Sequence, residues 1–289
     1  MPELPEVETI KRGLNKLIVG QKISTVSFDN VKSFPNTDED VDNFMLGATI
    51  IEVKRRAKVL IISLNTNYSL VIHLKMTGQL VFVDKDFRFG AGHPNDSLIG
   101  RLPDKSTRVT FNFSDGSRLF FNDQRKFGWI RLLPTILVPE MSFFKKVGPE
   151  PLEVGFSKQD FKARFANRQR SKIKAAILDQ SVIAGVGNIY ADESLWGAKI
   201  HPGRLVDSLS DDDFSNLYDE IRYVMNLSIE KGGSTDRNYI DAEGKKGSYL
   251  QFARVFRREG LACPRCGTDI IKIRVAGRGT HICPNCQKI

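Results

Sequence analysis

The hydrophobic pattern divides the chain into a β-rich first half and a helical second half. One amphipathic helix near Val7–Leu17 comes first. Apolar and β-branched residues then recur in short runs at 48–53, 59–64, 69–74, 79–83, 108–113, 118–121 and 129–133. Asp115-Gly116, between two of these runs, is typical of a tight hairpin turn. Many short strands after one helix predict an antiparallel sandwich or barrel, whereas residues 84–107 lack periodicity and predict a long loop.

Beyond a linker at 135–151, the apolar residues recur at helical spacing. Three serines are predicted to cap helices: Ser157 (a helix through Phe165), Ser171 (172–179) and Ser210 (211 to about Lys231). Gly185 and Gly187 come just before a helix that starts near Asn188. Backbone amides at the start of a helix can bind a phosphate. The alternative is an ordinary glycine-containing turn between two helices. Residues 232–250 are rich in Gly and Ser and predict a mobile loop that orders on ligand binding.

All four cysteines lie near the C-terminus, in two Cys-x-x-Cys pairs separated by sixteen residues: Cys263 and Cys266, then Cys283 and Cys286. This spacing lets four thiolates surround one tetrahedral Zn²⁺, and the alternating segment between the pairs predicts a β-hairpin. A closed site of four thiolates has no open position, so this zinc would be structural, and His281 is at most a stray ligand. The alternative is two disulfides, which require an oxidising compartment.

The basic charge is concentrated at the C-terminal end. The net charge is +9, and residues 231–289 alone carry 12 basic against 5 acidic side chains. A polyanion partner is expected, with nucleic acid ahead of a membrane because no basic amphipathic helix is present; a solvated basic surface is the alternative. No apolar run is long enough to cross a bilayer, and the acidic N-terminus is unlike a secretory signal. We therefore predict a cytoplasmic protein.

The N-terminus offers a possible nucleophile. Removal of Met1 would leave Pro2 as a secondary amine, and an α-amino group with a reference pKa near ~7.7–8.0 is partly neutral at physiological pH. Such an amine can attack the anomeric carbon of a sugar and form an iminium, with Glu3 beside it as acid or base. A Met-Pro start is common, so the dipeptide alone has little weight.

The other candidate site residues are weak evidence individually and indicate a function only when they are considered together. Lys58 follows a basic pair and could hold phosphates, while His73 and Met76, near a predicted strand end, are typical of a core. Arg125 and Phe127 place a cation beside an aromatic ring at a turn. An arginine can bind a base edge, and a phenylalanine can insert between base pairs.

Taken together, these motifs closely resemble the formamidopyrimidine-DNA glycosylase family, bacterial base-excision enzymes for oxidised purines. The resemblance spans nearly the whole chain in the family's order, through residues 1–8, 54–58, 73–78, 123–128, 185–193 and 276–281. It implies an α+β fold with an N-terminal antiparallel β-sandwich and flanking helix, then a helical helix–two-turns–helix region and a β-hairpin zinc finger. The implied boundaries are 1–134 (catalytic sandwich), 135–151 (linker), 152–250 (DNA binding, with a lesion-recognition loop at 232–250) and 251–289 (finger).

The resemblance also implies a bifunctional glycosylase and abasic-site lyase that rotates the damaged base out of the duplex. Pro2 would be the nucleophile and Glu3 the acid or base, with Glu6 organising the N-terminus, and β- and δ-elimination would leave a one-nucleotide gap. The implied partner is duplex DNA with oxidised purines or abasic sites, bound by a monomer that carries one structural zinc ion. The enzyme would associate with the nucleoid through its DNA.

Further site residues follow from the resemblance. Lys58, His73, Asn188 and Arg278 match positions that grip phosphates around the flipped nucleotide, and we place Lys58 and Arg278 in the catalytic set with Pro2 and Glu3. Met76, Arg125 and Phe127 match positions that fill the vacated stack, with Arg125 meeting the orphaned base.

Three features depart from the family. Val-Phe-Arg-Arg at 255–258 replaces Val-Tyr-Gly-Arg, so a hydroxyl contact to phosphate is lost, which Arg257 could offset. Ser106-Thr-Arg108 replaces His-x-His, and the loop before it is longer than usual. Two rival functions are an endonuclease VIII-type glycosylase for oxidised pyrimidines and a non-catalytic module that binds damaged DNA. The stack-filling residues favour the purine enzyme, and intact Pro2, Glu3 and Lys58 argue against the module.

Overall fold

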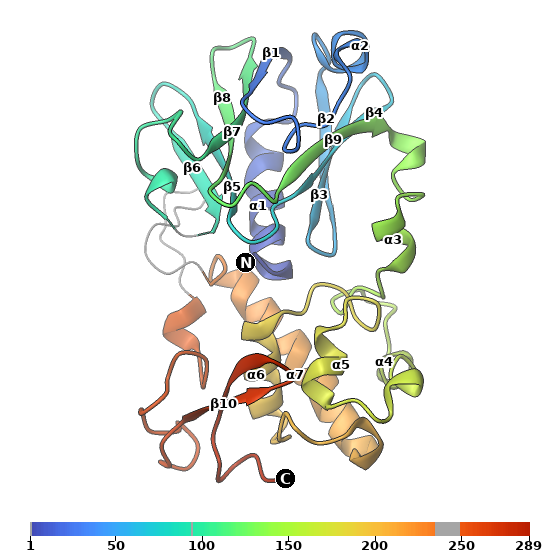
Figure 1. Ribbon diagram of the computed structural model, residues 1–289, viewed down its shortest axis with the longest axis vertical. Coiled ribbons are helices and arrows are strands. Elements are labelled where there is room, and N and C mark those ends of the chain that lie inside the picture. Colours follow the sequence, from blue (N-terminus) through green and yellow to red (C-terminus); the bar gives the residue numbers. More distant parts are fainter. Residues whose placement is uncertain (1, 94, 235–248) are drawn as a thin grey trace. The chain divides into compact units, whose positions relative to one another are not determined.

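The computed structural model describes residues 2–93, 95–234 and 249–289. The chain forms two compact units, Met1–Lys145 with Lys231–Ser248, and Lys146–Glu230 with Tyr249–Ile289. Strands dominate the first unit, and helices with a C-terminal hairpin make up the second (Figure 1). The predicted α+β fold is therefore confirmed. Residues 235–248, which hold most of the predicted recognition loop, lie outside the described residues.

Two antiparallel sheets build the first unit. One has the order β1 (Ile23–Phe28), β7 (Thr107–Phe113), β8 (Arg118–Asp123), β5 (Gly78–Val83), β6 (Arg88–Gly92). The other has the order β2 (Ile50–Arg56), β3 (Val59–Leu64), β4 (Tyr68–His73), β9 (Trp129–Pro134). Gly116, with φ of 89°, closes the predicted hairpin between β7 and β8.

Helix α1 (Leu4–Leu17) packs against strands of both sheets. Its residues Val7, Ile10 and Leu14 are fully buried and join a core that includes Ile62 and Phe89. The helix begins three residues before the predicted Val7, because Pro5 is tolerated in a first turn, where no amide partner is needed.

The predicted long loop at 84–107 is wrong in part, because β6 lies within it. The strand contains Gly90 and Gly92, which weaken the local signal, yet it pairs with β5 and buries Phe89. A short 3₁₀ helix, η2 (Asp96–Leu98), follows. The remaining segment is held by the Asp104 carboxylate, which accepts hydrogen bonds from Ser97 Oγ at 2.6 Å and Ser106 N at 2.7 Å.

The second unit is mainly helical. Its elements are α4 (Lys158–Ala163), η4 (Ala166–Arg168), α5 (Ile173–Leu178), α6 (Asn188–Gly197), η5 (Val206–Ser208), α7 (Asp211–Glu230), η6 (Tyr249–Phe252), β10 (Ile271–Val275) and β11 (Arg278–Ile282). The predicted caps Ser157 and Ser210 accept the amides of Asp160 and Asp213, each at 3.1 Å. The predicted Ser171 cap is wrong: α5 starts one residue later, with Lys172 at the N-cap, so Ser171 lies one position outside.

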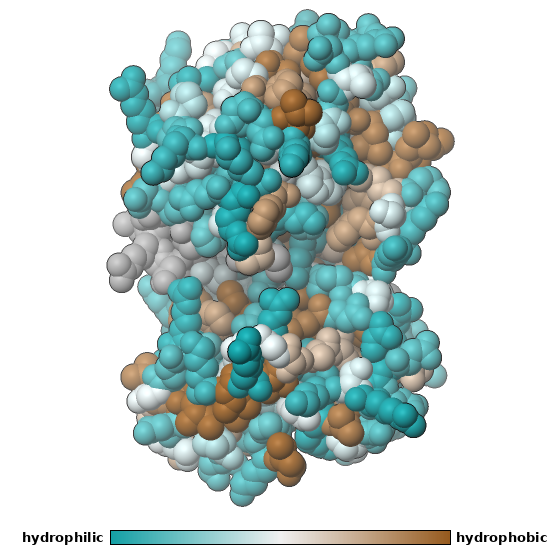
Figure 2. All heavy atoms as spheres, in the orientation of Figure 1, coloured by the Kyte–Doolittle hydropathy of each residue, from teal (hydrophilic) through white to brown (hydrophobic). Residues whose placement is uncertain are grey.

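Short helices occupy the first unit's connections and the predicted linker. They are α2 (Asp38–Asp40), the π-helix η1 (Val41–Met45), the 3₁₀ helix η3 (Thr135–Leu137) and α3 (Ser142–Lys146). On the face shown in Figure 2, hydrophilic side chains cover most of the surface, and hydrophobic ones gather in small groups. Among the described residues, no helix combines the length and apolar character that a bilayer span requires.

Candidate active site and nucleic-acid interface

The predicted nucleophile and acid or base lie at the start of α1. Pro2 and Glu3 are both buried, and Glu3 is 4% exposed. Glu6 holds this end of the chain in place: its Oε2 accepts the Glu3 amide at 2.8 Å, and its Oε1 accepts the Ser234 amide at 2.9 Å. One carboxylate therefore binds both the N-terminal segment and Ser234.

Lys58 lies at a two-residue turn between β2 and β3, after Ala57 with φ of 52°. The tight turn leaves Lys58 only 7% exposed, so this cation is held by its surroundings instead of moving freely in solvent. Arg55, near the end of β2, binds Glu8 at 2.9 Å. Burial raises the pKa of Glu8, but the hydrogen bonds and charges of Arg55, Arg12 and Lys11 together outweigh burial and lower that pKa overall.

His73 ends β4 in a defined tautomer. Its Nδ1 accepts the Lys75 amide at 3.0 Å, which leaves the proton of the neutral ring on Nε2. Burial, with the nearby charges of Lys75 and Lys58, lowers the pKa of His73 to about 3. His73 is therefore a neutral donor at physiological pH, able to offer Nε2–H to a phosphate oxygen.

Two loops present the predicted stack-filling residues. Met76 lies between β4 and β5 and is 38% exposed; Phe127 lies between β8 and β9 and is 53% exposed. The Arg125 guanidinium lies 4.8 Å from the centre of the Phe127 ring. Exposed apolar side chains beside a cation are suited to replacing a base in a stack.

Asp123, which the sequence analysis missed, joins these two loops. Its fully buried carboxylate accepts the Thr77 hydroxyl and the amides of Phe127 at 2.8 Å and Gly128 at 2.7 Å. The loops are thus fixed side by side, which brings Met76, Arg125 and Phe127 together. An aspartate at a strand end before a five-residue connection was the available signal, because such carboxylates often accept turn amides.

Gly78 makes the Met76 loop possible. The loop folds back so tightly that a Cβ on Gly78 would lie 2.3 Å from the Leu74 carbonyl oxygen. No side chain fits there, since that neighbour is backbone and cannot move aside without disturbing the turn.

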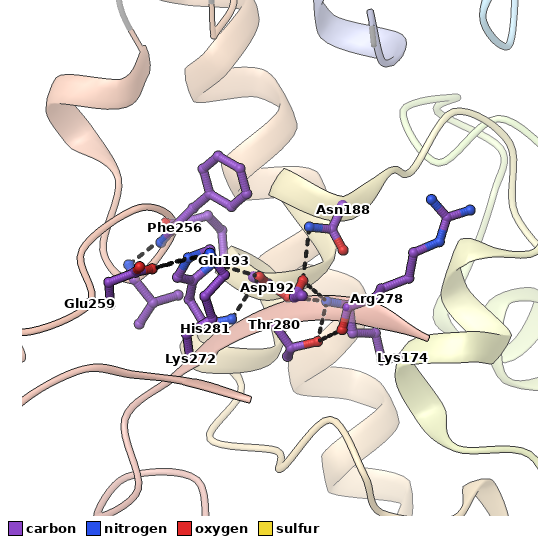
Figure 3. Close-up of polar contacts among 12 residues, drawn as sticks. Lys174, Asn188, Asp192, Glu193, Phe256, Glu259, Lys272, Arg278, Thr280 and His281 are labelled. Atoms are coloured by element: carbon purple, nitrogen blue, oxygen red, sulfur yellow. Dashed lines mark hydrogen bonds and ion pairs between the residues drawn. The ribbon is translucent and has the colours of Figure 1, made fainter. Parts of the chain in front are cut away.

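In the second unit, Asn188 joins the start of α6 to the hairpin. It is the first residue of α6, after Gly187 as the N-cap, and its Nδ2 donates to the Gly279 carbonyl at 3.1 Å. Arg278, one residue before Gly279, is exposed at the start of β11. In Figure 3 the side chains of Asn188, Arg278 and Phe256 project to the same side of the hairpin. The structure therefore brings the two phosphate-binding candidates of this unit together.

A buried ion pair positions these two residues. Lys174, fully buried in α5, donates to Asp192 Oδ1 at 2.6 Å, to Thr280 Oγ1 at 2.7 Å and to the Gly279 carbonyl at 3.2 Å. The other Asp192 oxygen accepts the His281 amide at 2.9 Å. The network fixes β11 against α6 (Figure 3). No local pattern predicts it, because the hairpin residues lie 89 to 106 positions from Lys174 and Asp192 in the sequence.

Glu193 performs a similar task one residue further along α6. Its buried carboxylate accepts three consecutive amides, those of Arg254 at 2.8 Å, Val255 at 2.9 Å and Phe256 at 2.8 Å. Three hydrogen bonds to one carboxylate give the segment 254–256 a fixed position against α6.

The four cysteine sulfurs form one cluster, with all four ligand atoms within 4.8 Å of one another. Cys263 and Cys286 Sγ lie 3.9 Å apart, and Cys266 and Cys283 Sγ lie 3.4 Å apart. A tetrahedral site with Zn–S bonds of about 2.3 Å needs sulfurs roughly 3.8 Å apart, whereas a disulfide needs about 2.05 Å. The donor set fits zinc. His281 instead contacts Asp192 and Glu259, at 3.2 and 2.9 Å.

Family models match along most of the chain. The formamidopyrimidine-DNA glycosylase N-terminal domain matches residues 1–130, the H2TH domain of the same enzymes matches 147–239, and the zinc finger found in FPG and IleRS matches 260–289. With the four-sulfur cluster, this last match assigns one structural zinc ion to the finger.

Individual relatives agree. Formamidopyrimidine-DNA glycosylases of Desulforamulus reducens and Streptococcus pneumoniae are 42% and 40% identical, over 100% of this chain and 99% of each relative. Two solved structures are each 36% identical: MutM with DNA containing carbocyclic 8-oxo-G (TM-score 0.86, 100% of both chains), and Lactococcus lactis Fpg with abasic-site DNA (TM-score 0.87, 99% of this chain and 100% of that one). The chain therefore belongs to the formamidopyrimidine-DNA glycosylase family.

Proposed function

We propose that this protein is a bifunctional DNA glycosylase and abasic-site lyase that removes oxidised purines, 8-oxoguanine and formamidopyrimidines, from duplex DNA. The observation that carries the proposal is full-length membership of the family together with Pro2-Glu3 at a buried helix start held by Glu6. Relatives of the same fold have been solved with DNA containing 8-oxo-G, Fapy-dG and an abasic site.

The amine of Pro2, once Met1 is removed, would attack C1′ of the damaged nucleotide. The new N–C1′ bond forms as the glycosidic bond breaks, and the base leaves with its electron pair and takes a proton. Opening of the sugar ring gives an iminium, whose positive charge makes removal of a C2′ proton easier. Glu3 is the proposed acid or base for these proton transfers. Elimination of the 3′ and then the 5′ phosphate leaves the one-nucleotide gap.

The other site residues would hold the DNA in the distorted form that this chemistry needs. Met76, Arg125 and Phe127 would fill the space left by the flipped nucleotide. Four residues would bind phosphates around it: Lys58, His73, Asn188 and Arg278. Their chemistry differs, because Lys58 and Arg278 are cations whereas Asn188 and, through its lowered pKa, His73 are neutral donors. We propose a monomer acting in the bacterial cytoplasm, associated with the nucleoid through DNA, since the relatives are bacterial proteins.

Borohydride trapping tests this proposal. Protein whose N-terminus has been checked by intact mass is incubated with a duplex carrying one 8-oxoguanine opposite cytosine, and borohydride is added. A covalent protein–DNA adduct is expected, because borohydride reduces the iminium to a stable amine. The adduct should be absent from a Pro2→Gly variant with an acetylated N-terminus and from protein that retains Met1.

A parallel duplex with an oxidised pyrimidine separates the rival functions, and Lactococcus lactis Fpg has itself been solved with such DNA. Faster trapping on the pyrimidine duplex would favour the endonuclease VIII-type activity. Failure of processed, zinc-loaded protein to form an adduct with either duplex would leave the non-catalytic binding module. Trapping by protein that retains Met1 would exclude the Pro2 amine as nucleophile.

A further inference from the structure

A cavity of about 470 Å³ lies in the second unit beside Asn188. Two cations, Arg257 and Lys272, contribute to its lining together with the Phe256 ring, Glu259 and His281. Glu259 is the acidic residue of this lining, and it contacts His281 at 2.9 Å and Lys272 at 3.6 Å. The lining therefore combines positive charge with amide and aromatic groups, a composition suited to an anion.

Arg257 has an unusual backbone conformation. Its φ is +58°, in the left-handed region that glycine adopts readily and other residues rarely do. Residues 254–256, just before it, are fixed by the three hydrogen bonds that their backbone amides donate to Glu193, so the backbone that leads to Arg257 has a defined position. Glycine would adopt this backbone conformation with less strain than arginine. An arginine here therefore suggests that its side chain has a role.

The surroundings of Arg257 suit it to phosphate. The residue is exposed, and its guanidinium carbon lies 5.7 Å from the centre of the Phe256 ring. Contact with the ring restricts the guanidinium, whose planar arrangement of donors matches the paired oxygens of a phosphate. Phe256 itself projects to the same side as Asn188 and Arg278 (Figure 3).

We propose that Arg257 binds a backbone phosphate of the DNA from the rim of this cavity, next to the phosphates bound by Asn188 and Arg278. The inference rests on the proposed function and adds to it a further cationic contact. Arg257 is a binding residue here and takes no part in the bond-breaking steps.

The test compares two matched glycine substitutions. Lys199 is also exposed, also has φ of +58°, and follows the far end of α6, whose ten residues put it about 15 Å from Asn188. Arg257→Gly and Lys199→Gly each remove one cation and relieve the same backbone conformation. Affinity is measured by fluorescence anisotropy with a duplex carrying a tetrahydrofuran abasic-site analogue, over a series of KCl concentrations.

For Arg257→Gly we expect Kd at low salt to rise roughly tenfold and the slope of log K against log[KCl] to become shallower by about 0.9, as for one lost phosphate contact. Its Tm should equal or exceed that of the wild type, whereas Lys199→Gly should leave affinity and slope unchanged. Arg257→Lys should retain the wild-type slope, because the charge is kept.

An Arg257→Gly variant that binds with the wild-type affinity and slope would overturn the inference, as would one that loses affinity only together with a fall in Tm. Failure of the proposed function looks different: the wild-type protein would then form no borohydride adduct and would not prefer lesion-containing over undamaged duplex.

Discussion

His73 illustrates how one residue's surroundings decide its chemistry. A histidine beside a phosphate is often assumed to be a cation, yet this ring is partly buried near Trp129 and Phe143, with ring centres 5.9 and 5.8 Å away, and lies near two lysine charges. Burial and these charges both disfavour protonation. Any phosphate contact made by His73 is therefore a hydrogen bond from a neutral ring.

We predict that His73 stays neutral down to about pH 4, because its pKa is about 3 against 6.5 for an unperturbed histidine. Between these values the unfolded chain binds a proton that the folded protein does not, so stability rises with pH through this window and levels off above 6.5. Ring-nitrogen NMR should show the Nε2–H tautomer without titration from pH 8 to pH 4. In His73→Asn, whose amide oxygen can accept the Lys75 amide, this part of the pH dependence should disappear. A midpoint above pH 5 would contradict the prediction.

At the level of elements, the local pattern predicted seven of the nine strands described in the first unit. β3 has the predicted bounds, and the other predicted strands differ by one to three residues at their ends. The two missed strands, β1 and β6, lie at opposite edges of one sheet. β1 is mostly exposed, and β6 contains two glycines, so neither has the alternating apolar pattern of a half-buried strand. β1 pairs with the distant β7, whereas β6 pairs with its neighbour β5.

The candidate site shows the same division. Residues proposed to touch DNA belong to short motifs, so the sequence pointed to them directly. Three residues that hold those motifs in place were missed. Lys174 and Glu193 bind partners elsewhere in the chain, whereas Asp123 accepts amides of the turn that follows it and therefore had a local signal. Burying a charged group costs free energy unless several hydrogen bonds compensate for the lost hydration. Partners that are distant in the sequence can be identified only once the fold is known.

Zinc is predicted to hold the finger against helix α6. Trp196 of α6 packs with Cys263, Cys283 and Val255, and its ring lies 3.9 Å from the Arg265 guanidinium. So small a module has little other core, and loss of the metal should loosen it and displace Arg278 on the hairpin. Removing zinc with a mercurial and a chelator should release one ion per chain. It should also lower affinity for lesion-containing duplex more than tenfold, reversibly on adding zinc back.

The emission of Trp196 reports the structural part of this prediction. The chain has two tryptophans, so a Trp129→Phe variant leaves Trp196 as the single tryptophan, which can be excited selectively over tyrosine. Its emission should shift to longer wavelength as zinc leaves, because the indole becomes exposed to water. Unchanged emission and unchanged DNA affinity in the metal-free protein would show that the finger holds its structure without the ion.

For the whole molecule, the distribution of charge indicates how affinity is divided. The net charge is +9, and residues 231–289 carry 12 basic against 5 acidic side chains. Cations that neutralise phosphates release counterions and make binding salt-dependent, whereas neutral donors add affinity without that dependence. The proposed phosphate contacts include both kinds.

We therefore predict different salt responses from Arg278 and Asn188, which the structure places side by side. Arg278→Ala should weaken binding to a lesion-containing duplex and make the slope of log K against log[KCl] shallower by about 0.9, because one cation–phosphate contact is lost. Asn188→Ala should weaken binding by a similar factor with the slope unchanged, since its amide carries no charge and its Nδ2 also loses the Gly279 contact. Lys199→Ala, at the far end of α6, serves as the control and should alter neither quantity. Equal changes of slope in the Arg278 and Asn188 variants would mean that Arg278 acts by supporting the hairpin and does not neutralise a phosphate.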